Sequence, residues 1–365
     1  MIRLSQCYTS KKEKDIISKV LDDTHLGMGK YVEEFELRLK KFLNNNVTTV
    51  INGTSGLMMA LQAIGIKSGD EVLVQSITYL SSFQAISALG AKPIACDVDE
   101  NMNISLQDAQ KKITKKTKAI MPVHYAGDPG NLSSLYNFAK KNKLRVVEDA
   151  AHAFGTKYKN MRIGSFGDII CFSFDGIKNI TCGEGGCIAS KDLEIIDRIN
   201  SIKLLGIKND YKNRFLNKRT WNFNVIEQGW RCHLSNINAA IGIEQLKKFN
   251  IIAKKRQSIA KKYDHFLKRS KNITFFRRDY NSIVPHIYPV LLNTNINRDD
   301  FVNYMEKNKI ETGVHYYPNH FLDLYKTKRK IPYTEKIYKH LLTLPLHPNL
   351  SKKDISYICK KVNEF

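Results

Sequence analysis

The chain has 365 residues, of which 42% are hydrophobic and 25% charged, a composition typical of a large globular protein. Its 58 Lys and Arg and 35 Asp and Glu give a formal net charge of +23. The basic residues are spread along the whole chain. A nucleic-acid-binding protein typically concentrates them in one stripe with interleaved aromatic residues. No apolar run approaches the roughly 20 residues of a membrane-spanning helix, and the first residues lack the apolar centre of a secretory signal, so we expect a cytoplasmic protein that binds neither nucleic acid nor membranes.

The excess of basic residues has two interpretations. It reflects either a bias toward lysine on solvated faces or a positive field that attracts an anionic small molecule; the composition favours the first, and the two can coexist. The seven cysteines are scattered, with no C-x-x-C pair, at Cys7, Cys96, Cys171, Cys182, Cys187, Cys232 and Cys359. This spacing indicates structural thiols and suggests neither a disulfide framework nor a metal site.

Short apolar runs alternate with helix-like segments in the first half of the chain. Strands are expected at 47–51, 71–75, 92–98, 118–124, 144–150, 168–174 and 186–190. Helices are expected between the earlier strands, at 55–65, 80–90, 105–113 and 132–142. This alternation predicts an α/β fold with a mostly parallel central sheet flanked by helices. Ligands of such sheets bind at the carboxyl ends of the strands, so the loops there are the expected place of chemistry.

The second half of the chain indicates a smaller lobe. Residues 206–229 show no clear period and resemble the long excursions that are usually functional or disordered. One long helix is expected at 236–269, followed by a strand at 287–292, a helix at 298–310 and a terminal helix from Lys352. We therefore expect a large domain over residues 1–235 and a smaller C-terminal α/β domain over residues 236–365.

Two of the loops at the expected strand ends carry polar residues suited to a charged ligand. The stretch NGTSG (52–56), with Thr54 and Ser55, stands between a strand and a helix, where N–H groups and hydroxyls can hold a phosphate; such junctions also use Gly and Thr for turn geometry alone. Asp149 follows an apolar strand, where a carboxylate is costly to bury without a positive partner. It either caps a helix or faces a cationic heterocycle, and His152 can point toward the same place.

The stretch FSFDGIKNITCGEGG (172–186) holds one lysine, Lys178, between an apolar run and a glycine-rich turn. This lysine is either a solvated loop charge or a shielded amine of lowered pKa that can bond covalently to an aldehyde. Ser173 can bond a phosphate, and Tyr79 can stack on a flat ring. A phosphate cradle, a buried acid, an amine and a stacking surface are together the parts that pyridoxal 5′-phosphate (PLP) requires.

Seven stretches carry a resemblance that covers nearly the whole chain. They are GKYVEEFE (29–36), NGTSGL (52–57), VHYAG (123–127), VVEDAAHAFG (146–155), CFSFDGIKNITCGEGG (171–186), NAAIGIEQL (238–246) and HYYPNH (315–320). On these stretches the chain resembles the PLP-dependent sugar-nucleotide aminotransferases of the aspartate-aminotransferase fold (fold type I). The resemblance implies PLP as cofactor and a homodimer whose subunits share their active sites.

The resemblance also implies a role for each matching position. Lys178 matches the lysine that holds the PLP aldehyde, and Asp149 matches the partner of the pyridinium nitrogen. The other cofactor positions are matched by His152 at the ring hydroxyl, Tyr79 at the ring face, and Thr54, Ser55 and Ser173 at the phosphate.

Two groups of residues leave their roles open. Arg231 stands where the family commonly has an asparagine from the second subunit; it either bonds the phosphate as a stronger cation or contacts the substrate. His315, Tyr316 and His320 match a loop that approaches the sugar in relatives, but the Tyr and Pro residues of this loop are equally suited to packing between the lobes.

The implied reaction moves an amino group from L-glutamate to a nucleotide-linked keto-deoxyhexose in deoxyamino-sugar biosynthesis, serving lipopolysaccharide or another glycan, with Lys178 as the base. The resemblance is strongest to enzymes that aminate C3 of dTDP-3-keto-6-deoxyhexoses, and C4 amination of a dTDP- or UDP-4-keto-6-deoxyhexose is the alternative. Two other classes are a nucleic-acid-binding regulator, for which the match leaves no spare segment, and an inactive relic, which the presence of Lys178 and Asp149 opposes.

Overall fold

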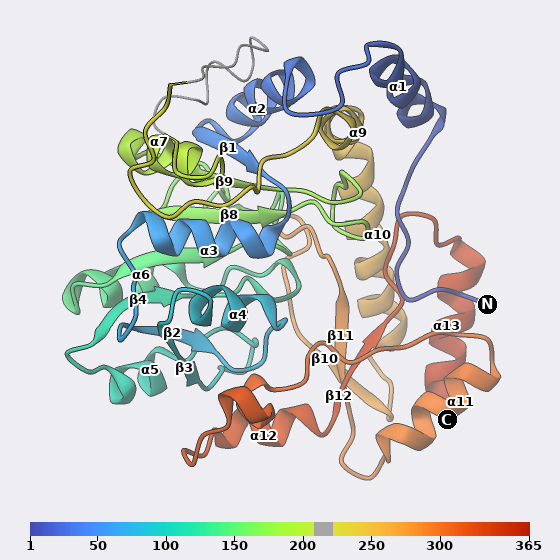
Figure 1. Ribbon diagram of the computed structural model, residues 1–365. Helices are drawn as coiled ribbons and strands as arrows, with labels where there is room; N and C mark the ends of the chain where they lie inside the picture. Colours follow the sequence, from blue (N-terminus) through green and yellow to red (C-terminus); the bar gives the residue numbers. More distant parts are fainter. Residues whose placement is uncertain (208–221) are drawn as a thin grey trace.

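The computed structural model describes residues 1–207 and 222–365, so most of the predicted excursion at 206–229 lies outside the described residues. Its centre is a sheet of seven strands (Figure 1). In sheet order these are β1 (Asn46–Val50), β9 (Gly186–Ser190), β8 (Ile169–Ser173), β5 (Arg145–Asp149), β4 (Thr117–Met121), β2 (Glu71–Gln75) and β3 (Lys92–Cys96). Only β9 runs against its neighbours, so the predicted mostly parallel sheet is confirmed.

Helices cover both faces of this sheet, and the strand sequences show why. In β2, Val72 and Val74 belong to one hydrophobic cluster and Leu73 to the other, because successive side chains of a strand point to opposite faces. The first cluster is covered by α3 (Gly53–Ala63), α4 (Ser81–Ser87) and α7 (Leu193–Ile202). The second is covered by α2 (Lys30–Leu43), α5 (Leu106–Lys112), α6 (Leu132–Lys141) and α9 (Asn236–Lys247). The strands are therefore apolar on both faces, as expected for a parallel sheet.

The C-terminal lobe is built on a three-stranded antiparallel sheet of β10 (Ile273–Phe275), β11 (Tyr288–Leu292) and β12 (Leu341–Leu344). The helices of this lobe are α10 (Phe249–Leu267), α11 (Arg298–Lys307), α12 (Pro332–Tyr338) and α13 (Lys352–Glu364). Figure 1 places the lobe beside the carboxyl ends of β5 and β8. The strand, helix and terminal helix expected at 287–292, 298–310 and from Lys352 are present.

The single long helix expected at 236–269 is wrong, because the chain leaves the helix at Lys248 and α10 begins at Phe249. The physical reason is that the two halves pack on different layers: α9 lies on α2 and on α1 (Lys11–Asp22), and α10 lies on α13. Phe249, at the break, is buried in the core beneath Gly155. The division of the chain at 235 and 236 stays a prediction.

Several elements have no counterpart in the sequence prediction. They are the helices α1, α2, α7 and α12, the strands β6 (Lys157–Tyr158), β7 (Met161–Arg162), β10 and β12, and the 3₁₀ turns η1 (Tyr125–Gly127), η2 (Asn319–Phe321) and η3 (Asp323–Tyr325). The turn η2 matters for the site, because its residues pack against the loop that follows β2. Within the described ranges, no helix has both the length and the apolar character needed to cross a bilayer.

Candidate active site

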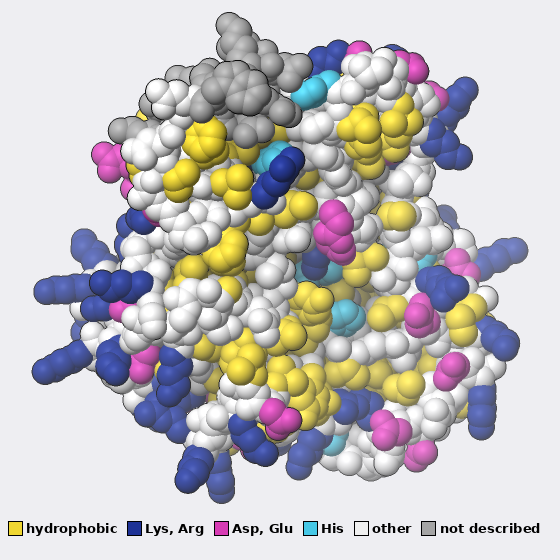
Figure 2. All heavy atoms as spheres, in the orientation of Figure 1, with side chains coloured by type: hydrophobic (Ala, Val, Ile, Leu, Met, Phe, Trp, Pro, Cys, Tyr) yellow, Lys and Arg dark blue, Asp and Glu magenta, His cyan; other side chains and the backbone are white. Residues whose placement is uncertain are grey.

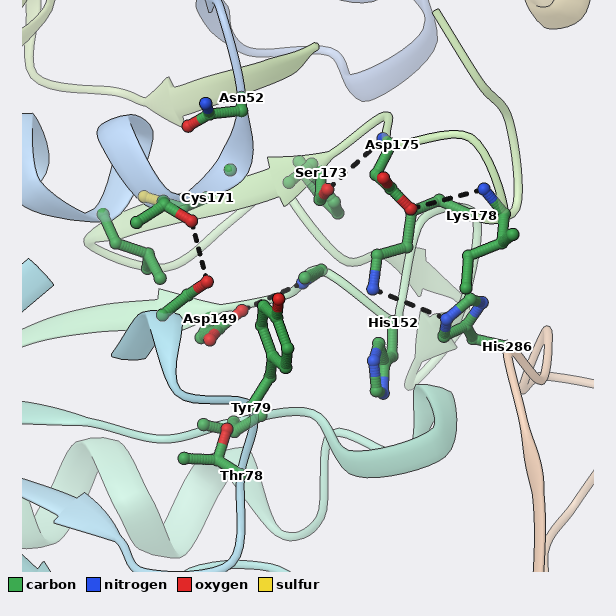
Figure 3. A pocket seen from close by; sticks show the side chains of 18 of the residues that line it. Asn52, Thr78, Tyr79, Asp149, His152, Cys171, Ser173, Asp175, Lys178 and His286 are labelled. Carbon is green, nitrogen blue, oxygen red and sulfur yellow. Dashed lines mark hydrogen bonds between the residues drawn. The ribbon is translucent and has the colours of Figure 1, made fainter. Parts of the chain in front are cut away.

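A cavity of about 400 Å³ lies at the carboxyl ends of β5 and β8, against the C-terminal lobe. It gathers eight of the side chains that the sequence singled out. They are Thr54, Tyr79, Asp149, His152, Ser173, Lys178, His315 and Tyr316. Figure 3 shows Asp149 and Ser173 at the ends of neighbouring strands, with His152 and Lys178 on the side of the cavity where His286 lies.

The amino end of α3 forms one wall of the cavity. Asn52 caps this helix, because its Oδ1 accepts a hydrogen bond from Ser55 N at 2.9 Å. The first N–H groups of a helix have no partner inside it, and together with the helix dipole they attract an anion. Gly53 keeps this wall open, since a Cβ there would stand 2.9 Å from Ser173 Cβ. The Thr54 and Ser173 side chains line the same corner, which suits a phosphate group.

Asp149 is a buried carboxylate, 5% exposed, at the end of β5. Its Oδ2 accepts a hydrogen bond from Ser82 Oγ at 2.7 Å, and its Oδ1 accepts one from Ala151 N at 3.2 Å. Both donors are neutral, and burial raises the pKa of the Asp149 carboxyl above its ordinary value. A buried carboxylate that faces a cavity with only neutral donors is suited to a cationic ligand group.

Lys178 lies in the turn after β8, where its N–H donates to Asp175 O at 3.1 Å. Its Nζ lines the cavity, 3.4 Å from His286 Nε2. Burial lowers the pKa of Lys178 from 10.5 to about 8; the carboxylates of Asp175 and Asp149 oppose this lowering and the Arg256 cation adds to it. Lys178 therefore lines a cavity and is not a freely solvated loop charge, and a larger share of its amine is neutral and nucleophilic near neutral pH than in an ordinary lysine.

Another wall of the cavity is made of the rings of His152, Tyr316 and Tyr79. His152 Nδ1 accepts a hydrogen bond from Ala126 N at 3.4 Å, which leaves Nε2 to donate to the Tyr316 hydroxyl at 3.0 Å. Burial, with the nearby cationic groups, holds the pKa of His152 well below its ordinary value, so this ring is neutral. Tyr79 is 60% exposed at the mouth of the cavity, with its ring 5.6 Å from that of Tyr316.

His315 completes the cavity on the side of the C-terminal lobe. Its Nδ1 lies 3.0 Å from Thr343 Oγ1 on β12. Burial, with the charge of Lys178, lowers the pKa of His315 to about 4. This imidazole is therefore also neutral, and it presents a polar edge without a charge.

Three of the predicted residues lie outside the cavity lining. Ser55 is turned into the start of α3, where its Oγ donates to Asn52 O at 3.0 Å. Arg231 is exposed and forms an isolated β-bridge with Leu204. His320 is buried behind the wall, with Nδ1 2.5 Å from Ser76 Oγ, and so supports the loop that carries Tyr79.

The structure adds residues that the sequence reasoning missed. The most important are Ser82 beside Asp149, Asp175 and His286 beside Lys178, and Arg256 behind them. His286 precedes an apolar strand of the other lobe, and no spacing connects it with Lys178. A signal for Arg256 exists, because it is a charge on the buried face of an amphipathic helix.

Comparison with known proteins identifies relatives of the whole chain. The model of the DegT/DnrJ/EryC1/StrS aminotransferase family matches residues 8–363. GDP-perosamine synthase from Escherichia coli O157:H7 is 37% identical over 364 residues, which cover 97% of this chain and 95% of the relative.

Solved structures agree with this match. PseC from Helicobacter pylori, an aminotransferase involved in pseudoaminic acid biosynthesis, superposes with a TM-score of 0.93 at 26% identity, covering 100% of this chain and 98% of its own. The PLP form of Spr1654 from Streptococcus pneumoniae has a TM-score of 0.91 at 25% identity, covering 100% of this chain and 97% of its own.

Proposed function

Because the chain belongs to the DegT/DnrJ/EryC1/StrS aminotransferase family, we propose that it transfers an amino group from L-glutamate to C4 of a nucleotide-linked 4-keto-6-deoxyhexose. Its family and its structural relatives make the chain a PLP-dependent sugar aminotransferase. We propose the amino donor, the carbon that is aminated and the nucleotide in addition.

The cavity fits PLP on three counts. The open corner between Gly53 and Ser173 at the amino end of α3 accepts a phosphate. The buried Asp149 carboxylate, bonded only to neutral donors, accepts a protonated ring nitrogen. The amine of Lys178 lines the same cavity with a lowered pKa, as covalent attachment to an aldehyde requires. The pairing of this acid with this amine in one cavity is the observation that carries the transaminase chemistry.

Each residue then has a proposed task. When bound, PLP carries the amino group and draws electrons from the bond that is broken. Asp149 keeps the proton on the ring nitrogen, and Lys178 Nζ, once free, moves the proton away from the Cα of the amino acid. Neutral His152 orients the ring hydroxyl. Thr54, Ser173 and the N–H groups of α3 bind the phosphate, and the exposed ring of Tyr79 covers the cofactor.

The choice of C4 rests on the relatives. GDP-perosamine synthase, which aminates C4, is 37% identical over nearly the whole chain. This similarity favours the C4 alternative over C3 of a dTDP sugar, which the sequence prediction placed first. A diphosphate-linked substrate is also consistent with the net charge of +23. Figure 2 shows Lys and Arg spread over this face, mostly toward its outline, with a hollow near its centre.

We also propose a cytoplasmic homodimer with shared active sites. Two observations support it: Tyr79, at the cavity mouth, is 60% exposed, and the guanidinium of Arg231 stands on the surface. In a dimer the partner subunit covers such an aromatic face, and Arg231 reaches the neighbouring site, where it bonds the cofactor phosphate or the diphosphate of the sugar nucleotide.

The test is a panel of keto sugars with glutamate. Purified enzyme is incubated with the 4-keto-6-deoxyhexoses of GDP, dTDP and UDP and with the dTDP-3-keto sugar, and the amino product is identified by NMR. We expect an amine at C4 of one nucleotide sugar. An amine at C3 alone contradicts the proposed regiochemistry, and no amine from any of the four contradicts the substrate class.

A further inference from the structure

A single buried arginine joins the lysine turn to the C-terminal lobe. Arg256 of α10 is 2% exposed. Its Nη1 donates to His286 O at 3.0 Å and to Leu346 O at 3.3 Å, and its Nη2 donates to Ile177 O at 3.2 Å and to Lys178 O at 3.5 Å. All four acceptors are main-chain carbonyls. This side chain therefore fixes the backbone of residue 178 relative to that of residue 286, although the two lie in different lobes.

The side chains of the two fixed residues meet inside the cavity. Lys178 Nζ lies 3.4 Å from His286 Nε2, a contact drawn in Figure 3. The imidazole of His286 is held in place by His152, because the two ring centroids are 4.4 Å apart. Burial and the neighbouring cationic groups hold the pKa of His286 well below its ordinary value. The lysine amine thus contacts a neutral ring. The position of this ring is fixed by the bond of Arg256 to the His286 carbonyl and by the neighbouring ring of His152.

We infer that His286 is a positioning residue for the Lys178 amine, because it holds Nζ in place whenever that amine is not bonded to the cofactor. Arg256 holds the backbones of the two residues in a fixed relative position. The inference rests on the proposed attachment of the cofactor to Lys178. It adds a residue of the C-terminal lobe to the reaction, and that residue acts on the amine and not on the substrate.

The charges around Lys178 explain why a neutral partner is useful. The titratable and charged groups facing it are Asp175 of its own turn, Asp149 of β5, His152 after β5, His286, His315 and Arg256. A lysine side chain is flexible, and a free amine that paired with Asp149 would gain a proton and occupy the carboxylate that the cofactor ring needs. A hydrogen bond to His286 keeps the amine on the opposite side of the cavity.

The experiment measures how fast the amine captures an aldehyde. Cofactor is removed from the full-length protein, PLP is added, and the rate of covalent attachment is followed by absorbance. In this step the Nζ lone pair bonds to the aldehyde carbon, and the aldehyde oxygen leaves as water with two protons of the amine. The same proteins are titrated with pyridoxamine 5′-phosphate, which has no aldehyde and reports the fit of the cofactor alone.

Three variants separate positioning from packing. His286→Phe keeps a flat ring without a nitrogen, His286→Gln places an amide near Nε2, and His286→Asn places one only near Nδ1. We expect capture to slow by on the order of 10-fold to 100-fold in the Phe and Asn variants and to recover in the Gln variant. Affinity for pyridoxamine 5′-phosphate is expected to change less than about threefold in all three, well below the tenfold that corresponds to about 1.4 kcal/mol.

Each other outcome overturns the inference. Wild-type capture by the Phe variant shows that the contact has no role. Equal losses in the Gln and Phe variants, or a parallel loss of pyridoxamine 5′-phosphate affinity, show that the ring only packs the cavity. If the Phe variant does not fold, the Asn and Gln pair decides. Failure of the wild-type protein itself to bond PLP overturns the role of Lys178, and this result is distinct because it does not depend on the variants.

Discussion

Replacing Lys178 with methionine (Lys178→Met) isolates the energetic consequence of placing an amine in the cavity. Burial lowers the pKa of this lysine from 10.5 to about 8. At about 1.4 kcal/mol per pKa unit, the protonated amine costs the cofactor-free fold about 3 kcal/mol. Methionine has a similar length and no charge. The cofactor-free Lys178→Met protein is therefore expected to be more stable than the wild type at pH 7, although it cannot bond PLP.

The sign of the pH dependence follows from the direction of the pKa change. Because the folded pKa is the lower one, the unfolded chain binds more protons between about pH 8 and 10.5, so wild-type stability rises with pH in this window. The advantage of the methionine variant is full below about pH 8 and disappears by about pH 10.5.

The assay is chemical denaturation of both cofactor-free proteins at pH 7, 9 and 10.5, because the difference between them cancels the titration of all other groups. The matched control is Lys353→Met at an exposed site, for which no such trend is expected. A methionine variant that is less stable at pH 7, or an advantage that does not shrink with pH, would refute the reasoning.

Three further predictions follow from the same geometry. Asp149→Asn removes the charge but keeps the contacts of the side chain with Ser82 and Ala151. The single-turnover reaction with glutamate is expected to slow by about 100-fold or more, since losing one partner of a buried charge pair costs about 3–5 kcal/mol. An unchanged rate would exclude the role of this carboxylate. Gly53→Ala places a Cβ 2.9 Å from Ser173 Cβ, so one of the two segments must shift. PLP affinity should therefore fall in an equilibrium titration, and the unfolding midpoint of the cofactor-free protein should fall as well. Unchanged affinity would argue against a phosphate at this corner. Arg256→Met leaves buried main-chain carbonyls without hydrogen-bond donors and should lower the free energy of unfolding by about 2–4 kcal/mol. An unchanged free energy of unfolding in chemical denaturation would show that the arginine does not join the lobes.

The elements around the cavity were predictable because their sequences are locally consistent. The strands β2, β5 and β8 are apolar runs that end in Gln75, Asp149 and Ser173. Carboxyl ends of parallel strands meet at one edge of a sheet, so Asp149, Ser173 and the nearby Lys178 were expected together. The same logic placed Thr54, because a strand-to-helix turn opens at that edge.

Other features depend on contacts that are distant in sequence. The break at Lys248 has no Pro or Gly signal, because it is caused by the packing of Phe249 beneath Gly155. His286 meets Lys178 through contacts between the lobes, among them the hydrogen bonds of Arg256 and the bond from Asn179 Nδ2 to Val284 O. Ser55 and His320 were assigned to the site because they match positions of the family resemblance, but their side chains bond Asn52 and Ser76 instead.

The covalent link between the cofactor and one lysine is the central claim, and peptide mapping tests it directly. The enzyme is loaded with PLP, reduced with borohydride and digested, and the peptides are sequenced by mass spectrometry. The account predicts a pyridoxyl group on Lys178 alone. A pyridoxyl group on a different lysine, or its absence from the peptide that contains Lys178, would contradict it.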